Sequence, residues 1–296
     1  MLSTSSRSIS EADVAAYERD GFFLMKRAFA PEWIDLMTRS VDEILDRPTE
    51  RGANLSGDGM PGRFAYDNYL WVGHPGFRRL AFESPVGAIA ASFMRARRVN
   101  LIYDFILVKE PYAKQETRWH QDIPTNPCEG RQTLGMWISL DHVTRDSGAV
   151  EWVRGSHKWG KRFVATTTGD PKRHKFLAGA NGEPAASGVP AADDADAVPV
   201  PDMAKERANY DIVSLETEPG DAIIASLWLL HGAPGNHTPR RRRAMGYRFV
   251  GEDSSYVVRS GARAIKTYTD PGLAHGAPFP DDPRHPVFPR IFPAAA

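Results

Sequence analysis

The tetrapeptide Trp119-His120-Gln121-Asp122 holds residue types whose spacing points directly to chemistry. In an extended strand, side chains two positions apart leave the same face, so we expect His120 and Asp122 to point at one atom. His231, far downstream, supplies a second imidazole. Two imidazoles and one carboxylate leave open positions on a metal ion, and this ligand set is typical of non-heme Fe(II) oxygenases.

Arg242 lies eleven residues after His231 and is suited to bind a carboxylate co-substrate through two parallel hydrogen bonds. If the surrounding strand continues to residue 250, small residues and two arginines share one face, namely Arg242, Ala244, Gly246 and Arg248. Small residues beside an arginine suit a cavity wall. Arg248 is then a candidate for binding an acidic group of the substrate, with an ordinary ion pair as the alternative.

Most histidines in proteins are packed or solvated rather than metal ligands. We interpret seven of the nine histidines in this way: His74, His142, His157, His174, His237, His275 and His285. His231 differs because it ends an apolar run, residues 223–230, that reads as a strand. Zinc is the competing metal, but catalytic zinc sites more often use three histidines, or two histidines and a glutamate.

Composition excludes several classes of partner. The chain has 296 residues, is 42% hydrophobic and 25% charged, and carries 37 basic and 37 acidic residues. This balance argues against nucleic acid or a membrane surface as the main partner. A single cysteine, Cys128, excludes an internal disulfide framework and suits the cytoplasm. No signal peptide or membrane-spanning run is expected.

Helix signals come first along the chain and strand signals follow. We expect a strand at 22–25 and helices at 12–19, 31–45 and 85–95, the first capped by Ser10 and the second opened by Pro31. Short β-type runs follow at 99–108, 134–140, 149–153, 211–215, 222–229 and 244–250. This order predicts an α+β, mainly β fold with the N-terminal helices packed on one side of a β sandwich or barrel.

We expect a single domain over residues 1–296, with its core at about 20–250. Residues 161–208 lack periodicity and form an insertion, which is either a lid over the site or a disordered surface loop. Residues 270–296 are Pro-rich and are expected to form a tail that lies over the body.

Several motifs in a fixed order resemble the phytanoyl-CoA dioxygenase family of Fe(II)/2-oxoglutarate-dependent oxygenases. The resemblance runs from about residue 20 to 250. It is carried by Glu18-Arg19-Asp20-Gly21-Phe22, Trp119-His120-Gln121-Asp122, Trp137-Ile138-Ser139-Leu140-Asp141, Gly155-Ser156-His157-Lys158, His231-Gly232 and Arg242-Arg243-Ala244.

The resemblance implies a double-stranded β-helix (jelly-roll, cupin-like) core. It implies that His120, Asp122 and His231 are the Fe(II) ligands and that Arg242 anchors the distal carboxylate of 2-oxoglutarate. Three further residues lie where such proteins often line the co-substrate pocket, namely Lys109, Thr133 and Trp137. For Trp137, an ordinary place in the core is the alternative.

The implied reaction uses O2 and 2-oxoglutarate to oxidise an unactivated C–H of a small-molecule metabolite, with release of succinate and CO2. Related iron halogenases lack the carboxylate ligand, so the presence of Asp122 favours hydroxylation or a related oxidation. Desaturation, epoxidation and ring closure use the same residues. The expected substrate is an acidic molecule or a biosynthetic intermediate.

Two alternatives of another class remain open. One is a catalytically silent protein that binds metal and 2-oxoglutarate on the same scaffold, although such proteins usually lose a ligand. The other is a non-redox metal enzyme. A group of aromatic residues is expected either to line an apolar substrate pocket or to belong to the core: Tyr66, Tyr69, Tyr103 and Phe105.

Overall fold

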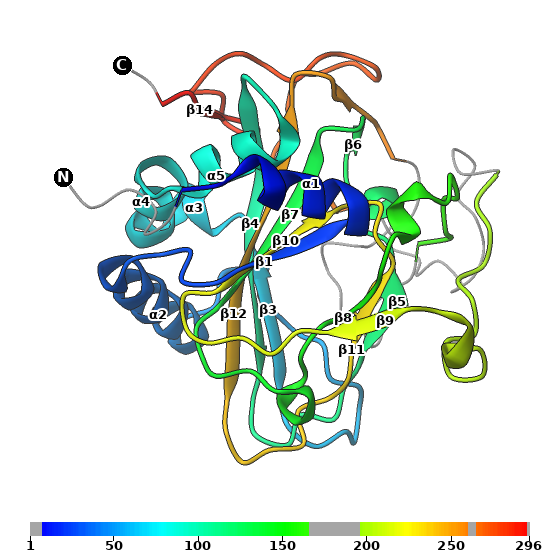
Figure 1. The fold of residues 1–296 in the computed structure, drawn as a ribbon. Helices are drawn as coiled ribbons and strands as arrows, with labels where there is room; N and C mark the ends of the chain where they lie inside the picture. Colours follow the sequence, from blue (N-terminus) through cyan, green and yellow to red (C-terminus); the bar gives the residue numbers. More distant parts are fainter. Residues whose placement is uncertain (1–7, 166–195, 260–264, 295–296) are drawn as a thin grey trace.

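Two antiparallel sheets form the centre of the computed structural model, which describes residues 8–165, 196–259 and 265–294 (Figure 1). The larger sheet has the strand order β1-β10-β7-β12-β4-β3-β2, and β14 also pairs with β4. Its strands are β1 (Phe22–Met25), β2 (Ala53–Asn54), β3 (Phe64–Asn68), β4 (Val99–Lys109), β7 (Thr133–Ser139), β10 (Ala222–Ser226), β12 (Arg242–Gly251) and β14 (Arg290–Phe292).

The smaller sheet has the order β5-β11-β8-β9. Its strands are β5 (Thr117–His120), β8 (Glu151–Val153), β9 (Ile212–Ser214) and β11 (His231–Ala233), and a separate pair is formed by β6 (Cys128–Glu129) and β13 (Ser255–Tyr256). Neighbouring strands in both sheets are mostly distant in sequence, as in jelly rolls built from Greek-key connections. The predicted jelly-roll core is confirmed.

The helices pack against one side of the larger sheet, as predicted (Figure 1). They are α1 (Glu11–Asp20), α2 (Pro31–Asp46), α3 (Leu70–Gly73), α4 (Pro75–Glu83) and α5 (Val86–Met94), and short 3-10 turns lie at η1 (Ile123–Thr125), η2 (Arg145–Ser147), η3 (Ser156–Lys158) and η6 (Arg207–Asn209). Ser10 caps α1 by accepting a hydrogen bond from the backbone N–H of Asp13. Gly21 ends that helix with φ at 85°, a conformation that glycine adopts without strain.

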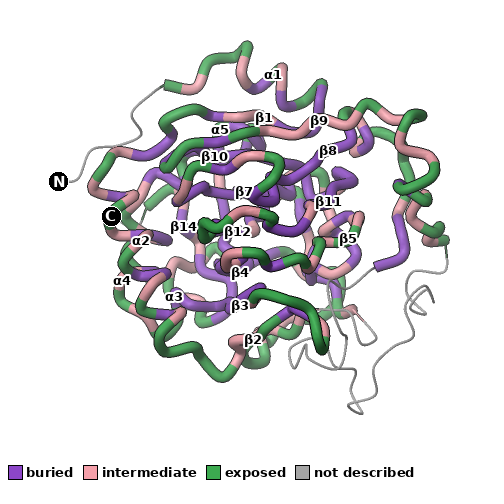
Figure 2. The backbone as a smooth tube through the Cα atoms, turned by 90° about the horizontal axis from the view of Figure 1, so that it is seen from below, coloured by how far each residue is buried: buried purple, intermediate pink, exposed green. Residues whose placement is uncertain are grey.

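Side chains along β12 alternate between two faces that have different surroundings. Met245, Tyr247 and Phe249 are buried in the apolar core shared with the helices, whereas Arg242 and Arg248 line a cavity between the sheets. This confirms the predicted register. Figure 2 shows the buried residues concentrated in the central strands, with exposed segments around them. Arg242 and Arg248 therefore point into the space between the two sheets, and the opposite face of the strand packs against the apolar core.

Sequence patterns missed β3 and the helices α3 and α4, which lie between the helices expected at 31–45 and 85–95. The residues from 166 to 195, most of the expected insertion, lie outside the described residues. Beyond residue 270, Phe279, Val287 and Phe288 are buried in a second apolar cluster. Among the described residues, no helix is both long and apolar enough to cross a membrane.

Candidate metal and co-substrate site

His120 and His231 lie directly opposite each other on the antiparallel strands β5 and β11. Their ring centroids are 4.2 Å apart. Nδ1 of His120 lies 2.7 Å from the carbonyl of Arg118, and Nδ1 of His231 lies 3.0 Å from the carbonyl of Leu229. Because a carbonyl only accepts, each Nδ1 must donate its proton there, which leaves the lone pair of each Nε2 free for a metal ion.

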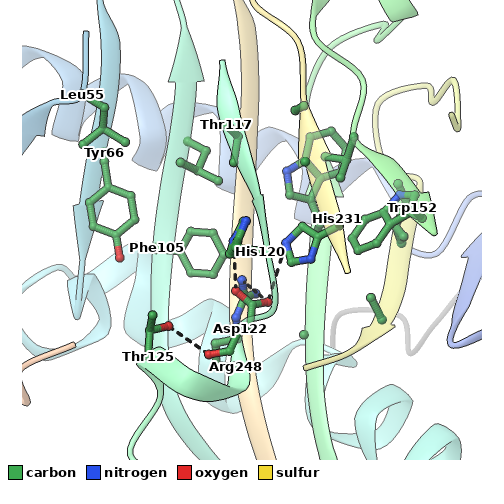
Figure 3. Close-up of a pocket in the computed structure, with 18 of the residues that line it drawn as sticks. Leu55, Tyr66, Phe105, Thr117, His120, Asp122, Thr125, Trp152, His231 and Arg248 are labelled. Carbon is green, nitrogen blue, oxygen red and sulfur yellow. Dashed lines mark hydrogen bonds and ion pairs between the residues drawn. The ribbon is translucent and has the colours of Figure 1, made fainter. Parts of the chain in front are cut away.

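Asp122 completes the group between the two imidazoles (Figure 3). Its Oδ1 lies 3.6 Å from Nε2 of His120, and its Oδ2 lies 3.9 Å from Nε2 of His231. Ligand atoms at about 2.0–2.2 Å from a metal ion and at right angles are about 3 Å apart. The three side chains are thus close to the spacing that one ion requires. Within the part of the chain that the structure describes, no other group of three such ligands converges.

The backbone reaches this geometry by a different route from the one expected. Strand β5 ends at His120, and Asp122 adopts helical angles of φ −78° and ψ −34° at the start of η1. The backbone N–H groups of Asp122 and Ile123 both donate to the carbonyl of Leu227, each at 3.0 Å, and this turns the chain. The premise of strand alternation was wrong, although the two side chains do converge.

His231 also begins a strand rather than ending one. Strand β10 stops at Ser226, and the N–H of Leu229 donates to the carbonyl of Ser226 to make a turn. The chain then enters the smaller sheet at His231. The continuous apolar run concealed this crossing, because residues on both sides of the turn are buried.

The electrostatics keep the group in its ligating form. Burial first, and then His120, lower the pKa of His231 to about 3, so this imidazole is neutral at physiological pH. Burial acts to raise the pKa of Asp122, but the positive charge of Arg248 contributes to a larger opposing effect, and the net shift is downward. Asp122 is therefore ionised.

A cavity of about 160 Å³ between the two sheets contains this group. Figure 3 shows Leu55, Tyr66 and Phe105 on one side of His120 and Trp152 on the other. Trp152 lies opposite His231 on β8, with its ring 4.9 Å from the imidazole and nearly parallel to it. Sequence reasoning missed Trp152, because its position beside His231 depends on the pairing of β8 with β11, which the residues around Trp152 do not indicate.

Arg242 is a buried cation on the cavity wall. Its guanidinium lies 5.8 Å from the ring centroid of Trp137, and Nη1 donates to the carbonyl of Leu107. Its Nε is buried and has no hydrogen-bond partner among the described residues. Burial lowers the pKa of Arg242 to about 10, so the group remains charged at neutral pH. A charged donor without a carboxylate partner fits an anionic co-substrate.

The other expected co-substrate residues occupy different places. Trp137 lines the cavity, whereas Lys109 and Thr133 do not. Lys109 lies opposite Arg242 in the strand register, with its side chain on the same face of the sheet, and its Nζ donates to the carbonyl of Pro234. Thr133 lies at the far end of β7, opposite Val250, so the structure gives no contact that supports a co-substrate role for it.

Of the four aromatic residues that were expected to lie either in a substrate pocket or in the core, three line the cavity and one belongs to the core. Tyr66, Tyr103 and Phe105 line the cavity, whereas Tyr69 is a core residue that packs on Tyr103 with ring centroids 5.5 Å apart. Arg248, the candidate for an acidic substrate group, has a partner within the protein. Its Nη2 lies 2.8 Å from Oδ2 of Asp122.

Other histidines have ordinary structural roles. His74 caps α4 by accepting from the N–H of Gly76, His142 pairs with the exposed Glu218, and His285 accepts from the N–H of Phe288. His174 lies outside the described residues. The interpretation of these side chains as non-ligands agrees with the single group of converging ligands within the described ranges.

Comparisons with solved structures find a similar fold in a carbocyclase and an epimerase. The non-heme alpha ketoglutarate dependent carbocyclase SnoK from nogalamycin biosynthesis aligns with a TM-score of 0.67 and 22% identity, over 97% of this chain and 98% of that one. The epimerase SnoN, solved with Fe3+, alpha ketoglutarate and nogalamycin RO, aligns with a TM-score of 0.69 and 21% identity, over 95% and 98% of the two chains.

Sequence comparison gives the family. An ectoine dioxygenase from Sphingopyxis alaskensis is 22% identical over 241 residues, which are 80% of this chain and 74% of that protein. The family profile described as "Phytanoyl-CoA dioxygenase (PhyH)" matches residues 17–244, a span that contains His120, Asp122, His231 and Arg242. The chain belongs to the phytanoyl-CoA dioxygenase family and is an Fe(II)- and 2-oxoglutarate-dependent dioxygenase.

Proposed function

We propose that His120, Asp122 and His231 hold the ferrous ion, that Arg242 binds the distal carboxylate of 2-oxoglutarate, and that the enzyme hydroxylates a small molecule. The observation that carries this proposal is the convergence of the three ligand atoms within 4.8 Å of one another, on the wall of the cavity that Arg242 also lines. The donor types fit iron, because this set leaves positions open for a co-substrate and O2.

Iron with bound 2-oxoglutarate supplies the oxidising chemistry, and the protein supplies binding, orientation and exclusion of water. The balance is one substrate C–H, 2-oxoglutarate and O2 converted into one C–OH, succinate and CO2. Arg242 fixes one end of the co-substrate by charge and by its fork of N–H donors. Trp137 gives a flat apolar surface beside that guanidinium.

The substrate portion that enters the cavity is proposed to be largely apolar. On the side occupied by β3 and β4, the wall is built of Leu55, Tyr66, Tyr103, Phe105 and Leu107. An acidic substrate has less support, because Arg248 is already paired with Asp122. The relatives named above act on ectoine and in nogalamycin biosynthesis, so a small metabolite is the proposed class of substrate.

The experiment is a titration of 2-oxoglutarate into anaerobic Fe(II)-loaded protein, followed by addition of O2. We expect a weak visible charge-transfer band on binding and slow formation of succinate after O2, with both lost in His120→Ala. His142→Ala is the matched control, since His142 is an exposed histidine in an ion pair with Glu218. Binding of 2-oxoglutarate without succinate formation would instead favour a silent binding protein.

Hydroxylation is proposed as the default outcome. The solved relatives are described as a carbocyclase and an epimerase, so this fold serves more than one outcome of C–H oxidation. The test is mass spectrometry of products from a panel of apolar metabolites whose presence accelerates succinate release. A gain of one oxygen atom supports hydroxylation, and a loss of two hydrogen atoms supports desaturation or ring closure.

A further inference from the structure

Arg248 contacts a proposed metal ligand rather than a surface carboxylate (Figure 3). Its Nη2 lies 2.8 Å from Oδ2 of Asp122, and the two side chains are only 12% and 13% exposed. A charged hydrogen bond of this length fixes the plane of the carboxylate. Asp122 cannot rotate away from the two imidazoles without breaking this ion pair.

The guanidinium of Arg248 is itself held in place. Nη1 donates to the carbonyl of Tyr247 at 3.2 Å. The central carbon of the guanidinium lies 4.6 Å from the ring centroid of Phe105, within the range of a cation–π contact. An arginine side chain normally has many rotamers, so these contacts reduce the entropy lost when Arg248 orients Asp122.

Two glycines make room for this arrangement. Gly135 lies opposite Arg248 across β7 and β12, and a Cβ added there would lie 3.0 Å from Nη1 of Arg248. A Cβ added at Gly246 would overlap the ring of Phe105. Neither glycine has a positive φ, so the backbone alone does not require glycine at these positions. The space for the guanidinium and its supporting ring does require it.

We infer that Arg248 is a positioning residue, which holds the Asp122 carboxylate in the orientation that the two imidazoles need to share one ferrous ion with it. This inference rests on the proposed function, since it takes Asp122 to be an iron ligand. Residues that hydrogen-bond to metal ligands typically change metal affinity by about 10–100-fold when they are replaced. The pair of Asp122 and Arg248 has no net charge before iron binds, because one arginine balances one aspartate.

Two effects of Arg248 on Fe(II) affinity oppose each other. Orientation of Asp122 strengthens binding, whereas the positive guanidinium repels a dication. Orientation is the larger effect. Loss of the side chain must therefore weaken Fe(II) binding, and tighter binding would show that repulsion prevails.

The test is the Fe(II) dissociation constant, measured by anaerobic equilibrium dialysis. Arg248→Met is expected to bind Fe(II) about 10–100-fold more weakly than the wild type. Arg248→Lys keeps the positive charge but lacks the planar set of guanidinium N–H donors, so its Fe(II) dissociation constant is expected to lie between those of the wild type and Arg248→Met. The matched control is Arg243→Met. Arg243 is on the same strand but faces Asp141 and Asp42 on the other side of the sheet, so its loss should change the constant less than about twofold.

Thermal unfolding of the metal-free proteins tests whether each variant folds. If Arg248→Met does not fold, Gly135→Ala replaces it, because the added methyl group shifts the guanidinium by a few tenths of an ångström while Arg248 remains, and weaker Fe(II) binding than in the wild type is expected. Fe(II) binding by folded Arg248→Met that equals or exceeds that of the wild type would overturn the inference alone. Wild-type Fe(II) binding by His120→Ala, measured in the same series, would instead overturn the proposed function.

Discussion

Lys109 and Arg242 lie directly opposite each other on β4 and β12, and both side chains are buried. Neither forms an ion pair with a carboxylate among the described residues. Burial first, and then the charge of Arg242, lower the pKa of Lys109 well below its usual value. Two buried basic groups in register are costly to charge together, and a dianionic co-substrate favours the charged form of both. The pair therefore links the stability of the protein to occupation of the co-substrate site.

Replacement of Arg242 by Met should weaken 2-oxoglutarate binding by at least about 30-fold, since truncation of one partner of a buried charged contact costs about 2 kcal/mol or more. Without co-substrate the variant should be at least as stable as the wild type, because a buried charge without a carboxylate partner is removed. Calorimetric titration of anaerobic Fe(II)-loaded protein measures the affinity. Unchanged affinity would show that Arg242 does not bind the co-substrate.

Replacement of Lys109 by Met should have a smaller effect, about tenfold, on 2-oxoglutarate affinity. Lys109 is not among the residues that line the cavity, so its amino group acts on the co-substrate at longer range than the guanidinium of Arg242 beside it. The same titration measures it. A loss larger than that in Arg242→Met would mean that Lys109, rather than Arg242, contacts the carboxylate directly.

Asp104 should make folding stability depend on pH. It is fully buried, it accepts the backbone N–H of Trp71 at 3.0 Å, and burial raises its pKa to about 7. Below about pH 4 the Asp104 carboxyl is protonated in both the folded and the unfolded chain, so its burial does not make stability depend on pH there. As the pH rises from about 4 to 7 the unfolded chain loses its proton first, and stability falls. A difference of about 3 units between the pKa of Asp104 in the folded and unfolded chain corresponds to a loss of about 4 kcal/mol in the free energy of unfolding.

The test compares Asp104→Asn with the wild type by urea unfolding of metal-free protein at pH 4.5 and pH 8. Asparagine keeps a carbonyl oxygen for Trp71 and cannot ionise. The stability of the variant relative to the wild type should therefore rise by up to about 4 kcal/mol between the two pH values. A difference that stays constant with pH would contradict a raised pKa at this carboxyl.

Residue types and spacing were sufficient to predict that His120, Asp122 and His231 converge, because a His-x-Asp motif and a distant His-Gly can be recognised in the sequence. They were also sufficient for β12, where arginines and small residues alternate with Met245, Tyr247 and Phe249. Local signals were weaker for β3, since Phe64–Asn68 follows a glycine-rich loop and has no clear alternation.

Pairings between distant strands were not predictable from one sequence. The contact of Trp152 with His231 depends on β8 lying beside β11, and the ion pair of Arg248 with Asp122 depends on the turn at η1. The co-substrate role expected for Thr133 came from position in the family pattern, and the strand register places Thr133 opposite Val250 rather than near Arg242. Propensity and spacing say which residues are buried, but long-range register decides which of them meet.

Gly246→Ala should lower stability by about 1–3 kcal/mol, which is the usual cost of inserting a methyl group into a packed site. The added methyl group would overlap the ring of Phe105, and that ring must then move into the cavity. Gly73→Ala is the matched control, because nothing lies within 4 Å of a Cβ at Gly73 and its φ is not positive. Thermal unfolding of the two variants measures the difference, and equal stability would argue against close packing of Phe105 on β12.

The most direct measurement is an anomalous difference map, recorded at the iron absorption edge, from crystals grown anaerobically with Fe(II) and 2-oxoglutarate. One strong peak is predicted at about 2.0–2.2 Å from Nε2 of His120, Nε2 of His231 and an oxygen of Asp122, with the co-substrate extending from it towards Arg242. A peak bound by other residues, or none in iron-loaded protein, would contradict the assignment of these three side chains as the iron ligands.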